Sequence, residues 1–242
     1  MKNLIVANWK LNPTTQKEAK EIFDAIREGA KGLNAEVVVC PPSVYLYASG
    51  FGEGIISMGA QNVFFEDKGA FTGEVSPAML KDLGVEYVII GHSERRKYFG
   101  ETDEAVNKKI KKSLEAGLKV IFCIGETAEE RDAGEKSEVL EHQIKEGLMG
   151  VGDLSNLSVA YEPVWAIGTG NNCGVQETKD SIDFIRQFVK PTTRILYGGS
   201  VKSENSGDYI KDAGANGLLV GGASLKPDEF IKIINSTLST GS

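Results

Sequence analysis

Short apolar runs recur at regular intervals along the chain. Most are continuous and rich in β-branched residues, and they do not alternate apolar with polar positions. This pattern is typical of strands that are buried on both faces, as in a parallel sheet. The eight runs predict strands at residues 4–8, 36–40, 55–61, 87–91, 119–125, 157–162, 194–199 and 217–222.

The segments between these runs are polar and carry helix start and stop signals. Thr15 with Glu18, and Thr127 with Glu130, have the spacing of capping boxes. The segment 102–117 begins with acidic residues, continues with lysines and ends in glycine, which suits both the dipole and the C-terminal cap of a helix. We therefore expect strands and helices to alternate along the chain.

Eight strand–helix units of about 30 residues predict an α/β fold, a closed (β/α)8 TIM barrel that forms a single domain over residues 1–242. The alternative is an open, doubly wound sheet, which usually has a glycine-rich phosphate loop after its first strand. Here the first strand ends in Asn8-Trp9-Lys10, and no linker interrupts the chain. We therefore favour one closed barrel.

Charge and cysteine content narrow the class of protein. The net charge of −7 argues against binding to nucleic acid or to anionic membranes. No apolar run approaches the roughly 20 residues of a membrane span, and the first residues are too polar for a signal peptide. Cys40, Cys123 and Cys173 are far apart and odd in number, which argues against a disulfide framework or a zinc site. We expect a cytoplasmic protein.

The carboxyl ends of the predicted strands carry polar residues and glycines, and this is the end where a (β/α)8 barrel has its functional site. Such barrels commonly bind phosphate in the loops after strands seven and eight, and here each of these loops contains a glycine pair. One pair alone would be explained by a tight turn, but two pairs at these positions favour a phosphate ligand. The candidate residues at the strand ends are Asn8, Lys10, His92, Glu94, Glu126, Glu162, Ser200, Gly221 and Gly222.

Three of these candidates suggest acid–base chemistry. Burial beside Trp165 would make Glu162 a stronger base; otherwise it is a salt-bridged structural acid. His92 precedes a helical turn, which favours a neutral imidazole that donates a hydrogen bond to a carbonyl; otherwise it is a structural histidine. Lys10 could stabilise negative charge that develops during a reaction, or be an ordinary surface lysine.

Together these groups predict proton abstraction next to the carbonyl of a small phosphorylated compound. One alternative is a barrel glycosidase that uses Glu94 and Glu162 as paired carboxylates. A dinucleotide enzyme is a weaker alternative, because the glycine motif at Gly168 lacks its third glycine. A third alternative is a catalytically inactive barrel that serves as a scaffold or binding protein. Glu94 and Glu126 fit better as structural acids, whose candidate partners are Lys10, Arg95 and Arg96.

Five motifs, in order and spread along essentially the whole chain, resemble those of the triosephosphate isomerase family. They are NWK at 8–10, GHSERR at 91–96, YEPVWAIGTG at 161–170, YGGSV at 197–201 and LVGGASL at 219–225. The resemblance implies interconversion of dihydroxyacetone phosphate and D-glyceraldehyde 3-phosphate, without a cofactor or a metal.

The resemblance also implies a role for each matching residue. Glu162 would move a proton between two carbons, neutral His92 would polarise the carbonyl, and Lys10 would stabilise the enediolate. A lid that follows Glu162 would close over the substrate. Asn8 would contact substrate oxygens, Glu94 and Cys123 would support the site, and the phosphate would be held by the backbone amides of Gly168, Ser200, Gly221 and Gly222.

The segment 61–77 resembles the loop through which members of this family form homodimers. The resemblance implies that Thr72 reaches towards the partner's active site. It further implies that the ion-pair residues around that interface are Glu74, Arg95 and Glu101.

The chain departs from the family after the Gly-Thr-Gly of the lid. The family often continues with a lysine, a small residue and alanine, but here the sequence is Asn171-Asn172-Cys173-Gly174. We therefore expect an unusual lid hinge, at which Cys173 is exposed to thiol reagents.

Overall fold

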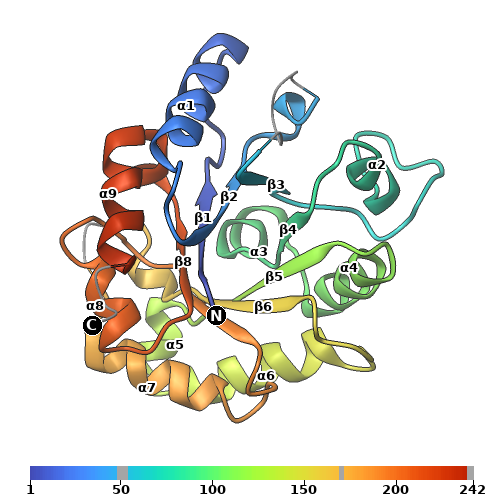
Figure 1. The fold of residues 1–242 in the computed structure, drawn as a ribbon. Helices are drawn as coiled ribbons and strands as arrows, with labels where there is room; N and C mark the ends of the chain where they lie inside the picture. The colour runs from blue at the N-terminus through green and yellow to red at the C-terminus, as the bar shows by residue number, and fades with distance from the viewer. Residues whose placement is uncertain (48–53, 169–171, 239–242) are drawn as a thin grey trace.

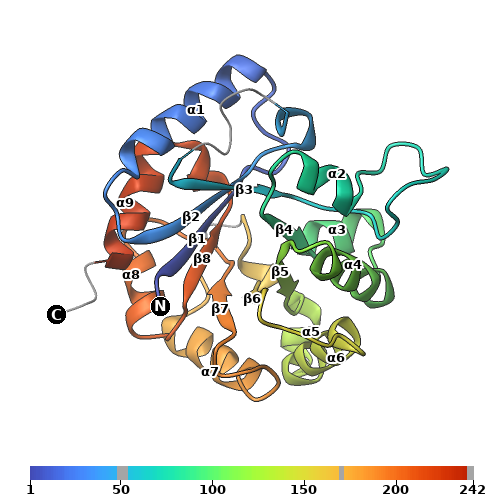
Figure 2. The same ribbon diagram turned by 45° about the vertical axis from the view of Figure 1, so that its right-hand side comes forward.

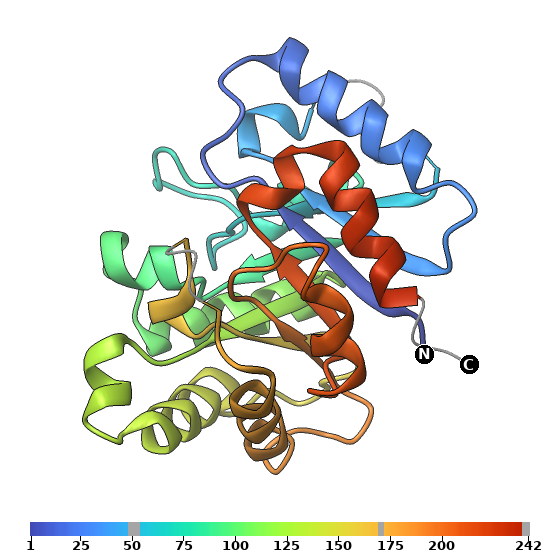
Figure 3. The ribbon, with the colours of Figure 1, turned by 90° about the vertical axis from the view of Figure 1, so that its left-hand side faces the viewer.

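Eight parallel strands close into a barrel in chain order, as the computed structural model shows for the residues it describes, 1–47, 54–168 and 172–238. Helices surround the barrel, and α1 and α9 lie side by side where the ring closes (Figures 1 and 3). The strands are β1 (Asn3–Asn8), β2 (Ala35–Cys40), β3 (Ile56–Ala60), β4 (Tyr87–Ile90), β5 (Lys119–Ile124), β6 (Leu157–Tyr161), β7 (Arg194–Tyr197) and β8 (Gly217–Val220).

The helices follow the strands on the outside of the barrel. They are α1 (Gln16–Gly29), α2 (Pro77–Asp82), α3 (Ser93–Phe99), α4 (Asp103–Glu115), α5 (Ala128–Asp132), α6 (Lys136–Leu148), α7 (Val175–Ile185), α8 (Ser206–Lys211) and α9 (Pro227–Leu238). Short 3-10 helices are η1 (Ser43–Tyr45), η2 (Val164–Ala166) and η3 (Gly222–Leu225). The segment between β3 and α2 projects away from the barrel (Figure 2).

The predicted closed barrel is confirmed, and all eight predicted strands are present. Several strands end one or two residues earlier than predicted. The polar residues and glycines that follow them, such as Glu162 and Gly221, leave the hydrogen-bonded ladder and form the loops at the carboxyl end of the barrel.

Helix caps form largely where the sequence signals them. Thr127 accepts a hydrogen bond from the backbone of Glu130, whose side chain accepts one from the backbone of Thr127 in return. Thr15 accepts from the Glu18 backbone and thereby starts α1, although no reciprocal bond is seen among the described residues. Each bond satisfies an N–H group that the first turn of a helix leaves without a partner.

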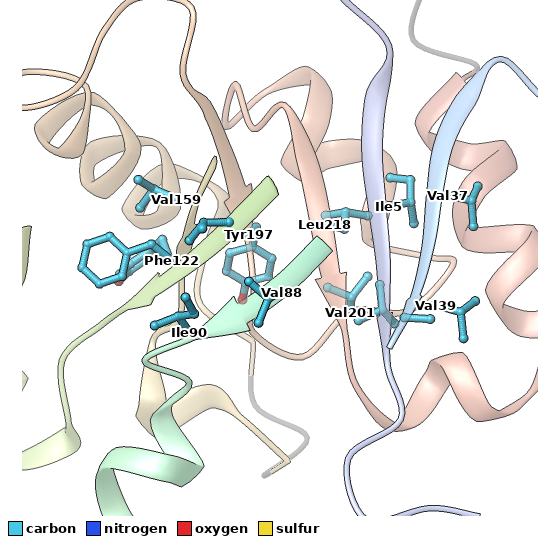
Figure 4. Packing of buried hydrophobic residues seen from close by; sticks show 14 of the residues in the cluster. Ile5, Val37, Val39, Val88, Ile90, Phe122, Val159, Tyr197, Val201 and Leu218 are labelled. Atoms are coloured by element: carbon cyan, nitrogen blue, oxygen red, sulfur yellow. The ribbon is translucent and has the colours of Figure 1, made fainter. Parts of the chain in front are cut away.

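The strands are apolar on both faces because the barrel has two cores. Leu4 and Val6 point into the barrel, whereas Ile5 and Ala7 pack in the layer between the strands and the helices, part of which is drawn in Figure 4. Successive side chains alternate across a strand, so Asn8 continues the inward-pointing set. The same alternation sets the direction of the site residues at the other strand ends.

An ion-pair network lies at the amino ends of the strands, opposite the predicted site. Glu36 accepts hydrogen bonds from the Tyr87 hydroxyl and, at 2.5 Å, from the Arg194 guanidinium. Lys119 lies 3.6 Å from the same carboxylate. Burial alone would raise the pKa of Glu36, but these three partners outweigh it and hold the pKa below its ordinary value of 4.5.

No helix within the described ranges is long and apolar enough to cross a membrane.

We expect Glu36→Gln to lower the free energy of unfolding at pH 7 by about 1–3 kcal/mol, because it leaves the Arg194 charge without its counterion. The pKa of Glu36 is lower in the folded state, so the wild type holds this stability above pH 4.5 and loses it as the pH falls further. Urea unfolding of both proteins between pH 3 and pH 7 measures the difference. Glu21→Gln, on the exposed surface of α1, is the control and should change little. A constant difference at all pH values would contradict this account.

Candidate active site

A cavity of about 530 Å³ lies at the carboxyl ends of the strands. It brings together residues that were predicted at five strand ends and in the loop after β6. Among the residues that line it are Asn8, Lys10, His92, Glu162, Gly168, Ser200, Gly221 and Gly222.

Glu162 directly follows β6, and only 1% of its surface is exposed. It continues the inward-pointing positions of its strand, after Ala160. One carboxylate oxygen lies 3.1 Å from Nε2 of His92, and the other accepts a hydrogen bond of 2.9 Å from the backbone N–H of Ser93. This buried acid therefore has a backbone donor at one oxygen and a ring nitrogen close to the other.

His92 is the N-cap residue of α3. Its Nδ1 accepts a hydrogen bond of 3.2 Å from the backbone N–H of Glu94, so Nδ1 carries no proton in this geometry. Its Nε2 is the ring atom that faces Glu162. The preceding Gly91 has a φ of +75°, which a side chain would disfavour, and its N–H donates to the carboxylate of Glu101.

Lys10 adopts a left-handed backbone conformation, with a φ of +53°, which is uncommon for a residue with a side chain. Two hydrogen bonds hold it there: its N–H donates to the Asn8 side chain, and its carbonyl accepts from the Gln61 amide. Its ammonium group lies 2.5 Å from Glu94, the partner expected from the sequence. Backbone strain of this kind is concentrated at functional sites, where the surroundings enforce it.

The far end of the cavity is formed by the loops after β7 and β8, with Ser200 and the pair Gly221-Gly222. Lys202 and Lys226 also line this end, and neither pairs with a carboxylate within the described part of the chain. Neither lysine was among the site residues predicted from the sequence. Their position in the sequence could have indicated a role at the site, because each lies within four residues of a glycine pair.

Glu126 was expected to pair with a lysine or an arginine, and this expectation was wrong. It is fully buried, and one of its oxygens accepts hydrogen bonds from the Trp165 indole at 2.8 Å and the Tyr161 hydroxyl at 3.2 Å. Burial raises the pKa of Glu126, and the bond from Trp165 offsets part of that effect. Neutral donors take the place of the expected cation because Glu126 faces Tyr161 and Trp165, which are close to it in space although distant in the sequence.

Cys173 was expected to be exposed, and this too was wrong. Only 1% of its surface is accessible, and it packs in the layer between the barrel and the helices. Its carbonyl accepts a hydrogen bond of 2.8 Å from the Tyr209 hydroxyl. Burial raises the pKa of the Cys173 thiol to about 11. Of its neighbours in the unusual hinge, Asn172 and Gly174 are exposed, whereas Asn171 lies outside the described residues.

Cys123 lies in the interior of the barrel, where burial raises the pKa of its thiol well above the ordinary value. A packing role agrees with this position. No group of three or more histidine, cysteine, aspartate or glutamate side chains that could hold a metal occurs in the described part of the structure.

Two of the four expected interface residues line a second cavity of about 370 Å³, which shares Lys10 and His92 with the first. Glu74 and Arg95 line it, and Thr72 is exposed on the segment that projects between β3 and α2. Glu101 is buried within its own chain, where its carboxylate contacts Arg95 and Lys109.

Comparisons with known proteins agree on one family. The family model described as triosephosphate isomerase matches residues 3–237. The chain is 46% identical to the triosephosphate isomerase of Alkaliphilus metalliredigens, over 97% of this chain and 99% of that protein. It is 48% identical to that of Thermodesulfovibrio yellowstonii, over 96% and 98%, and 45% identical to that of Aquifex aeolicus, over 98% and 100%.

The burial of Cys40, Cys123 and Cys173 predicts that the native protein resists thiol reagents. At pH 8 we expect an aromatic disulfide reagent to modify none of them within minutes, and to modify all three after denaturation. Rapid reaction of one thiol in the native protein, lost in Cys173→Ala, would show that Cys173 is accessible after all.

Proposed function

Since this chain belongs to the triosephosphate isomerase family, we propose that it interconverts dihydroxyacetone phosphate and D-glyceraldehyde 3-phosphate through an enediolate. The chain is an isomerase by its family, and this reaction belongs to glycolysis and gluconeogenesis. The observation that carries the proposal is the buried carboxylate of Glu162 beside Nε2 of His92, at the wall of a cavity whose far end suits a phosphate.

Glu162 acts as the base in this proposal. It takes a proton from the carbon next to the substrate carbonyl and returns it to the neighbouring carbon, so that no atom is gained or lost. A base that is shielded from water is poorly solvated and therefore more reactive towards carbon acids. Because one carboxylate oxygen lies 3.1 Å from Nε2 of His92 and the other accepts a hydrogen bond from the backbone of Ser93, the side chain must turn away from both before it can reach the substrate.

His92 and Lys10 stabilise the negative charge that appears on the substrate oxygens. The Nε2–H of His92, released by Glu162, donates to the carbonyl oxygen and moves protons between the two oxygens. The Lys10 ammonium adds a fixed positive charge, and Glu94 keeps it in place. Asn8 lines the same part of the cavity and contacts substrate oxygens.

The phosphate of the substrate binds at the other end of the cavity, to the backbone amides of Gly168, Ser200, Gly221 and Gly222. We expect the segment that follows Glu162 to act as a lid, with Trp165 and Ile167 excluding water from the reaction. Exclusion of water strengthens every electrostatic interaction within the site.

We further propose that the chain acts as a homodimer. Large apolar side chains are exposed around the second cavity, including Leu11 (91% exposed) and Phe99 (70%). An apolar surface of this kind is typical of a protein interface. Thr72 on the projecting segment would enter the partner's second cavity, beside Glu74 and Arg95, and support Lys10 and His92 from there.

Glu162→Asp should lower the turnover of triose phosphate by about 100-fold or more, because loss of one methylene withdraws the base from the reacting carbon. A coupled assay measures turnover, and circular dichroism confirms the fold. The control Glu138→Asp, on the exposed face of α6, should keep full activity. A wild-type protein that is folded but inactive would exclude the isomerase and favour the scaffold alternative.

Phe99→Glu should weaken the dimer at least tenfold, because association would bury a charge. Sedimentation velocity should give twice the 26.1 kDa chain mass for the wild type and a concentration-dependent monomer for the variant. Met149→Glu places the same charge on another exposed apolar position, after α6, and should stay dimeric. A monomeric wild type at micromolar concentration would contradict the proposed assembly.

A further inference from the structure

Glu229 lines the first cavity at the end where we propose that the phosphate binds, although a carboxylate repels an anion. It is the third residue of α9, the helix that follows the loop after β8. Glu204, in the loop after β7, brings a second carboxylate to the same wall. The two acids differ in their contacts, and this difference indicates what Glu229 does there.

The carboxylate of Glu229 holds the loop after β7. One oxygen accepts a hydrogen bond of 2.8 Å from the backbone N–H of Ser203, and the other accepts one of 3.2 Å from the Ser203 hydroxyl. We call these two bonds the Glu229 clamp. The carboxylate of Glu204 is exposed and forms no hydrogen bond or ion pair within the described ranges. Glu204 therefore contributes its charge alone, whereas both oxygens of Glu229 are bonded to the neighbouring loop.

Hydrogen bonds of Asn205 connect Ser203 to Ser200 within the loop after β7. The Asn205 side chain accepts a bond of 2.8 Å from the N–H of Lys202 and donates one of 3.3 Å to the carbonyl of Ser200. The N–H of Asn205 donates to the carbonyl of Lys202 at 3.2 Å. Because these bonds close a compact turn around Ser203, a contact that holds Ser203 also fixes the direction of the Ser200 backbone.

The other side of the Glu229 clamp is continuous with the glycine pair after β8. The N–H and the hydroxyl of Ser224 both donate to the carbonyl of Gly221, at 2.9 Å and 2.7 Å. The carbonyl of Lys226 then accepts a bond of 2.9 Å from the N–H of Phe230, so α9 begins directly after η3. Glu229 precedes the fully buried Phe230, and its position relative to the glycine pair is thereby fixed.

We propose that Glu229 is a positioning residue, which holds the loop after β7 against α9 so that the backbone amides of Ser200 and Gly222 converge on the phosphate of the substrate. This inference rests on the proposed function of the same site. The helices that follow the two loops, α8 and α9, lie side by side and are joined separately, since the hydroxyls of Ser206 and Ser236 are 2.5 Å apart (Figure 1). Loss of the Glu229 clamp should therefore loosen the turn without separating the helices.

The positioning role and the charge of Glu229 predict effects of opposite sign. By charge alone, removal of either glutamate would strengthen the binding of an anion to the cavity. If Glu229 positions the loop, its removal weakens the binding although a negative charge is lost. Glu204 measures the effect of charge alone, because it lines the same cavity without holding a loop.

Glu229→Ala and Glu204→Ala test the inference, with inorganic phosphate as the ligand and titration calorimetry as the measurement. We expect Glu229→Ala to lower the affinity for phosphate about tenfold, the effect of one lost charge-assisted hydrogen bond. Glu204→Ala should raise the affinity by less than about twofold, since it removes an exposed charge that is screened by salt. Glu229→Gln keeps an acceptor for the N–H of Ser203 and should stay within about threefold of the wild type.

Thermal unfolding of each variant separates a local effect from loss of the fold, and Glu229→Ala should unfold as cooperatively as the wild type. Unchanged or tighter phosphate binding in Glu229→Ala would overturn the positioning role, and so would an equal loss in Glu229→Gln. The KM for triose phosphate should rise in Glu229→Ala more than kcat falls, because Glu162 and His92 are held by other contacts. A wild type that binds phosphate but does not isomerise triose phosphate would overturn the proposed function, and the phosphate affinities would then decide the role of Glu229 by themselves.

Discussion

The site depends on one buried interaction, that of the Glu162 carboxylate with Nε2 of His92 and the backbone N–H of Ser93. A carboxylate that is almost fully withdrawn from water is costly unless donors surround it. The barrel supplies them because β4 and β6 end at the same edge, with the residues after each strand turned inward. In the mechanism that we propose, substrate takes over the contact with His92 and so releases the glutamate from this position.

The cavity contains positive side chains although the protein as a whole is negatively charged. The chain carries a net charge of −7, yet its proposed substrate is an anion. Lys10, Lys202 and Lys226 line the cavity and offset the three glutamates that also line it, and low-dielectric walls make these nearby charges more effective than distant ones. Asn8 and Gln61 hold the backbone of Lys10 in its strained conformation and Glu94 holds the ammonium group, so its charge is fixed in direction as well as in place.

Much of this architecture could be predicted from the sequence. Continuous apolar runs indicate buried parallel strands, and the polar residues that end them indicate the site, because both signals are local. The partners of Glu126 and the burial of Cys173 could not be predicted. Both residues contact side chains distant in the sequence, since Trp165 donates to Glu126 and Tyr209 donates to the carbonyl of Cys173. The glycine-rich stretch beside Cys173 suggested that its side chain is exposed, but the side chain is buried in the outer core.

The neutral His92 that we propose is the part of the account that a single measurement reaches most directly. The protein has two histidines, so nitrogen-15 NMR of the labelled enzyme, compared with a His142→Gln variant, isolates the ring of His92. The geometry predicts a protonated Nε2 and an unprotonated Nδ1 at neutral pH, since Nδ1 accepts the bond from Glu94. A spectrum with protons on both nitrogens would show an imidazolium and contradict the account.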